Sequence, residues 1–137
     1  MRCVLLERAR ERDVLAGRDA VLDYLRSQMA FDRRETLRVL YLDAAHRLIA
    51  DEVASEGTVD SLAFYTREIV IRALEVGAVG LILAHNHPSG TPAATPADIA
   101  ATSALGKACA PLGIMVLDHI IIAESGSQSL RAAGLLP

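Results

Sequence analysis

The sequence VGLILAHNHPSGTPAATPAD, residues 79–98 of this 137-residue chain, predicts a short buried strand followed by a loop and a helix. Its uniformly apolar run Val79–Ala84 is typical of a central strand, and the strand leads directly to His85. The Pro/Gly/Thr-rich segment Pro88–Ala94 predicts a loop, after which a helix begins at Thr95 with Pro96 in its first position. Functional sites of α/β domains usually lie at such a strand end.

Three side chains of this stretch suit one metal ion. His85 and His87 stand at i and i+2, so on an extended chain they point the same way, with Asn86 on the opposite side. Asp98 lies in the first turn of the predicted helix and can approach the same point. Two imidazoles and one carboxylate suit a catalytic zinc ion that keeps its fourth position open for water. The competing interpretation makes Asp98 the acidic member of a Thr-x-x-Asp cap with Thr95, and each histidine an ordinary loop residue.

The flanking sequence predicts a single α/β (α+β) domain over residues 18–137, with a mixed sheet flanked by helices. Residues 1–17 are expected to form an N-terminal arm or a short helix. The predicted elements are a helix from Asp19 to about Ala30, a strand Leu37–Asp43, a turn at Ala44–Ala45, a return strand His46–Ser55, a helix capped by Thr66 with a Tyr65–Val70 staple and ended by Gly77, a strand Ile114–Ala123, and a turn at Ser125–Gly126 that leads to a short tail.

Composition restricts the partners and the compartment. The net charge of −3 gives no global positive field, which argues against nucleic-acid binding without an added DNA-binding segment. Cys3 and Cys109 fit no CxxC spacing, so we expect a reduced, cytoplasmic protein. No apolar run reaches the roughly 18 residues of a membrane span. The apolar, strand-rich composition allows a homodimer without requiring one.

The motifs HNHPSG (His85–Gly90), Asp98–Ile99 and Leu117–His119 resemble those of the bacterial RadC family. The segments His85–Pro88 and Thr95–Asp98 also resemble the JAMM (MPN+) motif of zinc metallohydrolases, in which a distant Glu is followed by His-x-His-Pro and Ser-x-x-Asp. The resemblance covers roughly residues 18–137 and implies a JAB/MPN-like (cytidine-deaminase-like) domain. By that resemblance His85, His87 and Asp98 hold one zinc ion, while Glu35 is the distal glutamate and Thr95 occupies the serine position.

The activity implied by the resemblance is hydrolysis of an amide or isopeptide bond in a peptide or protein-conjugate substrate. Glu35 would act as the catalytic base and pass the proton to the leaving amine, and Thr95 is the second candidate catalytic residue. Glu52 and Glu56 compete with Glu35 for the role of distal glutamate. The alternative functions are a DNA-repair-associated domain and a non-catalytic protein-interaction domain.

Asp118 and His119 interrupt the most apolar predicted strand. Adjacent strand residues face opposite sides, so both cannot line one pocket from the same face. Either the carboxylate satisfies a backbone or histidine donor, or one of the two residues orients a metal-binding imidazole. The sequence leaves both interpretations open.

Overall fold

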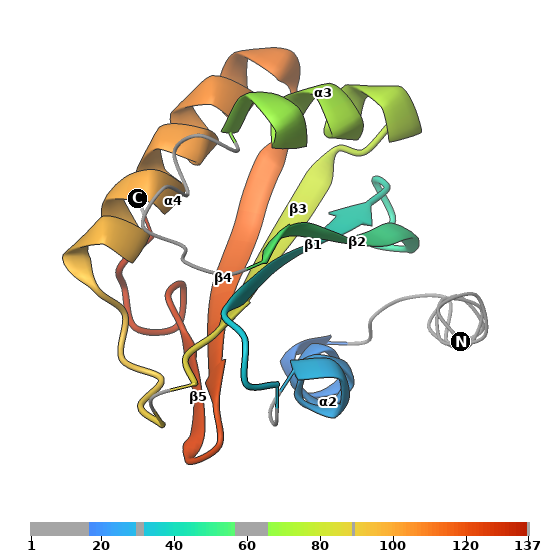
Figure 1. Ribbon diagram of the computed structural model, residues 1–137. Helices are drawn as coiled ribbons and strands as arrows, with labels where there is room; N and C mark the ends of the chain where they lie inside the picture. Colours follow the sequence, from blue (N-terminus) through green and yellow to red (C-terminus); the bar gives the residue numbers. More distant parts are fainter. Residues whose placement is uncertain (1–16, 30–31, 57–65, 89, 137) are drawn as a thin grey trace.

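A five-stranded mixed sheet forms the centre of the computed structural model, with strand order β2-β1-β3-β4-β5 (Figure 1). The structure describes residues 17–29, 32–56, 66–88 and 90–136. Along the chain the elements are α2 (Gly17–Met29), β1 (Thr36–Leu42), β2 (Leu48–Glu56), α3 (Thr66–Val76), β3 (Gly80–Asn86), α4 (Pro96–Cys109), the 3-10 turn η2 (Ala110–Leu112), β4 (Met115–Ala123) and β5 (Gly126–Ser129).

The centre of the sheet is β3, which pairs antiparallel with β1 and parallel with β4. A parallel pair needs a crossover connection, and α4 supplies it between β3 and β4. The register places Leu37 of β1 opposite His85, and His85 opposite Ile121 of β4. Both outer pairs, β1 with β2 and β4 with β5, are antiparallel.

The helices form a layer on each face of the sheet (Figure 1). Helices α3 and α4 cover one face, where Leu81 and Leu83 of β3 belong to the larger apolar core. Helix α2 covers the other face, where Ile82 and Ala84 belong to a second core. Successive residues of β3 therefore point to different layers, which is the geometry that separates His85 from Asn86.

The predicted fold class and the order of helices and strands down to β4 are confirmed. Two strand boundaries shift by two residues, and the other strand boundaries shift by at most one. Strand β2 begins at Leu48 rather than His46, because the Asp43–Arg47 turn places His46 in the left-handed region at φ 60°. Strand β3 continues through His85 and Asn86 instead of ending at Ala84.

The predicted short tail after β4 is the larger correction. The turn lies at Glu124–Ser125, and β5 then pairs with Ile120–Ala123 of β4. A segment reading Gly-Ser-Gln-Ser carries no apolar alternation, so its pairing could not be inferred from pattern.

Among the sequence predictions, the arm before residue 17, the helix end at about Ala30 and the Tyr65 half of the hydrophobic staple lie outside the described residues. The left-handed residue expected after α3 is present, with Gly77 at φ 74°. None of the helices in the described part of the chain has the length and hydropathy that crossing a bilayer requires.

Candidate metal centre

Three buried side chains meet where β3 ends and α4 begins. His85, His87 and Asp98 each offer a ligand atom, and these atoms lie within 4.8 Å of one another. The carboxylate lies between the rings, with Oδ1 3.6 Å from His85 Nδ1 and Oδ2 3.5 Å from His87 Nε2. The two ring centroids are 4.6 Å apart and nearly perpendicular. The carboxylate contacts are too long for good hydrogen bonds, which leaves nitrogen and oxygen lone pairs directed at a common space.

A backbone hydrogen bond to β4 positions His87, although β3 ends one residue earlier at Asn86. The backbone N–H of His87 donates to the carbonyl of Ile122 at 2.8 Å, so the chain remains beside β4 before it turns away. The His87 ring is then fixed by the loop, with Nδ1 3.0 Å from the Thr91 carbonyl. A carbonyl only accepts, so Nδ1 carries the hydrogen and Nε2 presents its lone pair toward Asp98.

Asp98 is both the acidic member of a helix cap and part of the cluster. Its backbone N–H donates to Thr95 Oγ1 at 3.1 Å, and its Oδ2 accepts from the Thr95 N–H at 2.9 Å. This reciprocal capping box starts α4, with Pro96 in the first turn. Asp98 therefore caps α4 and at the same time lies in the cluster, because the cap fixes the carboxylate where the histidines arrive.

His85 supplies the strongest indication that the cluster takes a ligand. Among the described residues, its Nδ1 and Nε2 are both buried without a hydrogen-bond partner. Burial lowers the pKa of His85, although the nearby Asp98 carboxylate opposes the shift. A neutral ring with an unshared lone pair in a buried site costs free energy unless something binds it. A divalent ion held by two imidazoles and one carboxylate fits this donor set.

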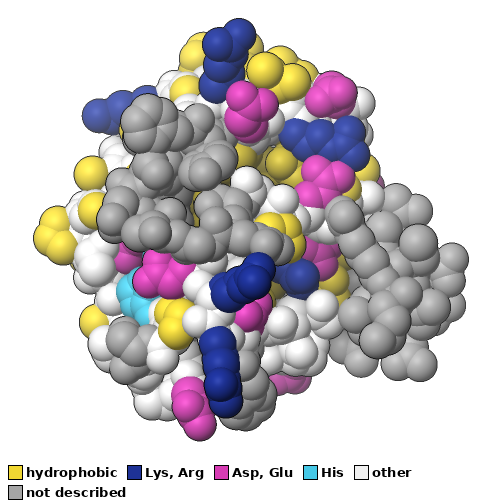
Figure 2. Space-filling view, viewed as in Figure 1, with side chains coloured by type: hydrophobic (Ala, Val, Ile, Leu, Met, Phe, Trp, Pro, Cys, Tyr) yellow, Lys and Arg dark blue, Asp and Glu magenta, His cyan; other side chains and the backbone are white. Residues whose placement is uncertain are grey.

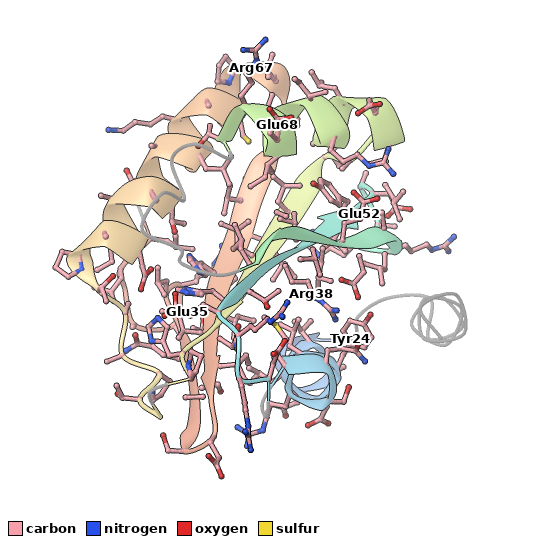
Figure 3. All side chains as sticks on the ribbon, in the orientation of Figure 1. Tyr24, Glu35, Arg38, Glu52, Arg67 and Glu68 are labelled. Carbon is pink, nitrogen blue, oxygen red and sulfur yellow. The ribbon has the colours of Figure 1, made fainter. Side chains whose placement is uncertain are left out.

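Glu35 is an acidic residue at the solvent-exposed edge of the cluster. It precedes β1, and its Oε2 lies 3.9 Å from His85 Nε2 while the side chain is 39% exposed. Its competitor Glu52 forms a bidentate ion pair with Arg72 of α3, at 2.7 Å for the closest contact, on another part of the sheet (Figure 3). The Glu56 side chain lies outside what the structure describes.

Asn86 holds the segment that carries Glu35, an interaction that the sequence did not reveal. Its Oδ1 accepts from the Thr36 N–H at 2.7 Å, and its Nδ2 donates to the carbonyls of Asp32 and Arg34 at 3.1 and 2.6 Å. The sequence indicates only that Asn86 faces away from the histidines. One strand thus presents an imidazole to the cluster and, from its other face, an amide that fixes the start of β1.

Asp118 and His119 separate into two different roles. The Asp118 carboxylate accepts from the backbone N–H groups of His119 and Arg131 at 2.7 and 3.1 Å, and from Ser129 Oγ at 2.5 Å. These contacts favour the structural interpretation of Asp118. His119 is fully buried on the α4 side and bonds to Thr102, a partner that sequence reasoning missed.

The arrangement joins a donor set that could hold a metal ion to a neighbouring carboxylate that is partly exposed to solvent. Histidine surface lies beside acidic side chains on the face seen in Figure 2. Thr95 Oγ1 accepts from the Asp98 N–H, which leaves the hydroxyl hydrogen able to donate outward. Such a site can bind a cation, polarise a substrate oxygen and move a proton through Glu35.

Comparison with known proteins finds two similarities over most of the chain. The family model described as "RadC-like JAB domain" matches residues 15–135. A UPF0758 protein of Ruegeria pomeroyi is 46% identical over 129 residues, which cover 94% of this chain and 58% of that protein. The chain thus spans less than two thirds of the length of this curated relative.

Proposed function

The chain belongs to the family of RadC-like JAB domains, and from that premise we propose that it is a zinc-dependent hydrolase acting on amide bonds. His85, His87 and Asp98 would hold one zinc ion. The observation that carries the proposal is the buried cluster itself: three ligand atoms lie within 4.8 Å of one another, and neither nitrogen of His85 has a hydrogen-bond partner among the described residues. A structural zinc site would use four protein ligands, whereas the part of the chain that the structure describes brings three to this cluster.

Zinc at such a site supplies Lewis acidity, which polarises a carbonyl and brings the pKa of water toward about 7. The chain's own residues supply the proton transfer. Glu35, 3.9 Å from His85 and partly exposed, takes the proton of the attacking water and later gives it to the leaving amine. The Asn86 amide holds the backbone of Asp32, Arg34 and Thr36 on either side of Glu35. The position of the Glu35 backbone is therefore fixed before the substrate binds, which lowers the entropy cost of the proton transfer.

Thr95 is the proposed donor to the developing oxyanion. The Thr95 hydroxyl oxygen accepts from the Asp98 N–H, and this bond fixes the position of the hydroxyl. Its hydrogen can therefore donate to another group. The proposed substrates are peptides or protein conjugates, because the leaving group that Glu35 would protonate is an amine. The cytoplasm is the proposed compartment, because Cys109 is buried as a free thiol.

The first experiment measures metal content and hydrolysis on the same preparations. Elemental analysis of the purified chain is expected to give one zinc per chain, and His87→Ala is expected to lose it. Hydrolysis is then followed on a peptide and isopeptide library with wild type, Glu35→Gln and the matched control Glu52→Gln. The control changes the same residue type at a carboxylate that pairs with Arg72 away from the cluster.

We expect zinc binding in all three proteins and hydrolysis in wild type and Glu52→Gln alone. Full activity in Glu35→Gln would contradict the proposed base, and one-to-one zinc in His87→Ala would contradict the ligand set. Zinc binding without hydrolysis of any library member would reject the hydrolase and favour the non-catalytic interaction domain.

A further inference from the structure

His119 of β4 lies fully buried behind His85, under the first turns of α4. Its ring centroid is 5.9 Å from that of His85, and the two rings are tilted by 39°. Its Nδ1 is 2.6 Å from Thr102 Oγ1, whereas its Nε2 is buried without a hydrogen-bond partner among the described residues. A fully buried polar side chain with one unpaired nitrogen, in a ring that neighbours a proposed metal ligand, requires an explanation.

The hydrogen-bond network assigns the tautomer of His119. Thr102 Oγ1 also lies 2.7 Å from the Asp98 carbonyl oxygen, which can only accept. The single hydroxyl hydrogen therefore points at that carbonyl, and the hydroxyl must accept from His119 Nδ1–H. Nε2 then carries a lone pair and no hydrogen. Burial lowers the pKa of His119 to about 3, so the ring stays neutral near pH 7.

His85 has the complementary need. A neutral imidazole that gives one nitrogen to a metal keeps one N–H, and metal-binding histidines almost always donate that hydrogen to a fixed acceptor. The carboxylate oxygens near His85 are 3.6 Å away in Asp98 and 3.9 Å away in Glu35, both beyond good hydrogen-bond length. Asp98 is itself a proposed ligand, and Glu35 is the proposed base.

We propose that His119 is a positioning residue of the metal centre, whose Nε2 lone pair, fixed by Thr102, accepts the N–H of the metal-loaded His85. This inference rests on the proposed metal binding and extends it beyond the three ligands. Thr102 joins two parts of the site, because one hydroxyl contacts both the His119 ring and the backbone carbonyl of Asp98. The orientation of His85 and the start of α4 are then set by one buried network.

The test measures zinc affinity, by chelator competition, in variants that remove different atoms of His119. Asparagine keeps a donor near the Nδ1 position and has nothing at the Nε2 position, while glutamine can place an oxygen acceptor there. His119→Asn is expected to weaken zinc binding by about 10- to 100-fold, and His119→Gln is expected to recover most of the loss. The matched control is Asp118→Asn. The Asp118 carboxylate accepts from the backbone N–H of His119 as well as from Ser129 and Arg131, and asparagine keeps an oxygen acceptor there, so its zinc affinity should equal that of wild type.

Equal zinc affinity in His119→Asn and wild type would overturn the proposal, as would an equal loss in His119→Gln and His119→Asn. If His119→Asn does not fold, the ¹⁵N chemical shifts of the wild-type rings decide: a protonated Nδ1 and a bare Nε2 on His119 support the proposal, and the reverse refutes it. None of these measurements uses hydrolysis. A chain that binds zinc through this network but cleaves nothing would therefore refute the proposed hydrolase and leave the role of His119 intact.

Discussion

Replacing Asp98 separates the two tasks of a side chain that both caps α4 and faces the histidines. Asp98→Asn keeps a carbonyl oxygen that can accept the Thr95 N–H, so the capping box survives while the carboxylate charge is lost. Asp98→Ala removes the acceptor and the charge together. Thr95→Ala is the reciprocal control, because it removes the hydroxyl half of the cap and leaves the carboxylate in the cluster.

The expected magnitudes differ between metal-free and metal-loaded protein. Without metal, losing the cap should cost Asp98→Ala about 1 kcal/mol. For a domain of this size that cost lowers Tm by about 3–6 °C. At free zinc 100-fold above the wild-type Kd, the ion adds about 2.7 kcal/mol to wild type. Both Asp98 variants should lose most of that gain, whereas Thr95→Ala should keep it and show only the loss of the cap.

The assay is thermal unfolding with excess EDTA and again with excess zinc. In EDTA, the Tm of Asp98→Asn is expected to be close to that of wild type. The rise in Tm on adding zinc is expected to be as small for Asp98→Asn as for Asp98→Ala. If Asp98→Asn gained the full wild-type stabilisation from zinc, Asp98 would be a helix cap alone and the proposed ligand set would fail. If Asp98→Ala matched wild type in EDTA, the cap would contribute nothing measurable to α4.

Three further outcomes follow from the contacts around the site. Asn86→Ala leaves the buried Thr36 N–H unpaired and should lower the free energy of unfolding in urea by about 2–3 kcal/mol; a loss below about 0.5 kcal/mol would contradict the clamp. The stability of metal-free protein should fall as pH drops from about 6.5 to 5, by up to about 1.4 kcal/mol per pH unit per histidine, because unfolding lets His119 bind a proton that burial opposes; the same slope in His119→Gln would refute this cause. Asp51→Ala should lower the free energy of unfolding by about 3 kcal/mol, because Arg38 loses the carboxylate that lies 3.4 Å away. A urea midpoint equal to that of wild type would exclude this contribution.

The parts of the fold that follow from local chemistry were predictable from the sequence. The run Val79–Ala84 predicts a central strand, and the structure has β3 at that place, buried along its whole length. Thr95 and Pro96 predict the start of α4, which begins there with both hydrogen bonds of a capping box. These signals work because each depends on residues that are neighbours along the chain.

The parts that were not predictable depend on contacts across the fold. The bond between Thr102 and His119 and those from Asn86 to the segment before β1 join residues that are far apart in sequence. A lone threonine in a helix gives no sign of such a partner. The β4–β5 hairpin was missed for a related reason, since β5 is polar and its pairing is decided by the apolar strand beside it. The Arg38–Asp51 pair lies on the side of the sheet that faces α2, and Tyr24 of α2 donates to the same carboxylate. This cluster likewise depends on the docking of the helix (Figure 3).

The alternation of faces along β3 has a consequence for anyone who wishes to transplant this site. Removing a single residue upstream of His85 would rotate the imidazole toward α2 and swing the Asn86 amide toward α4, so both would fail at once. A graft onto another scaffold must therefore keep the alternation of inward- and outward-facing residues along this strand as well as its sequence. An engineered barrel or sandwich could match the positions of the three ligands and still lack the residues that surround them here. Without counterparts of Asn86 and His119, its imidazoles would not be held in place.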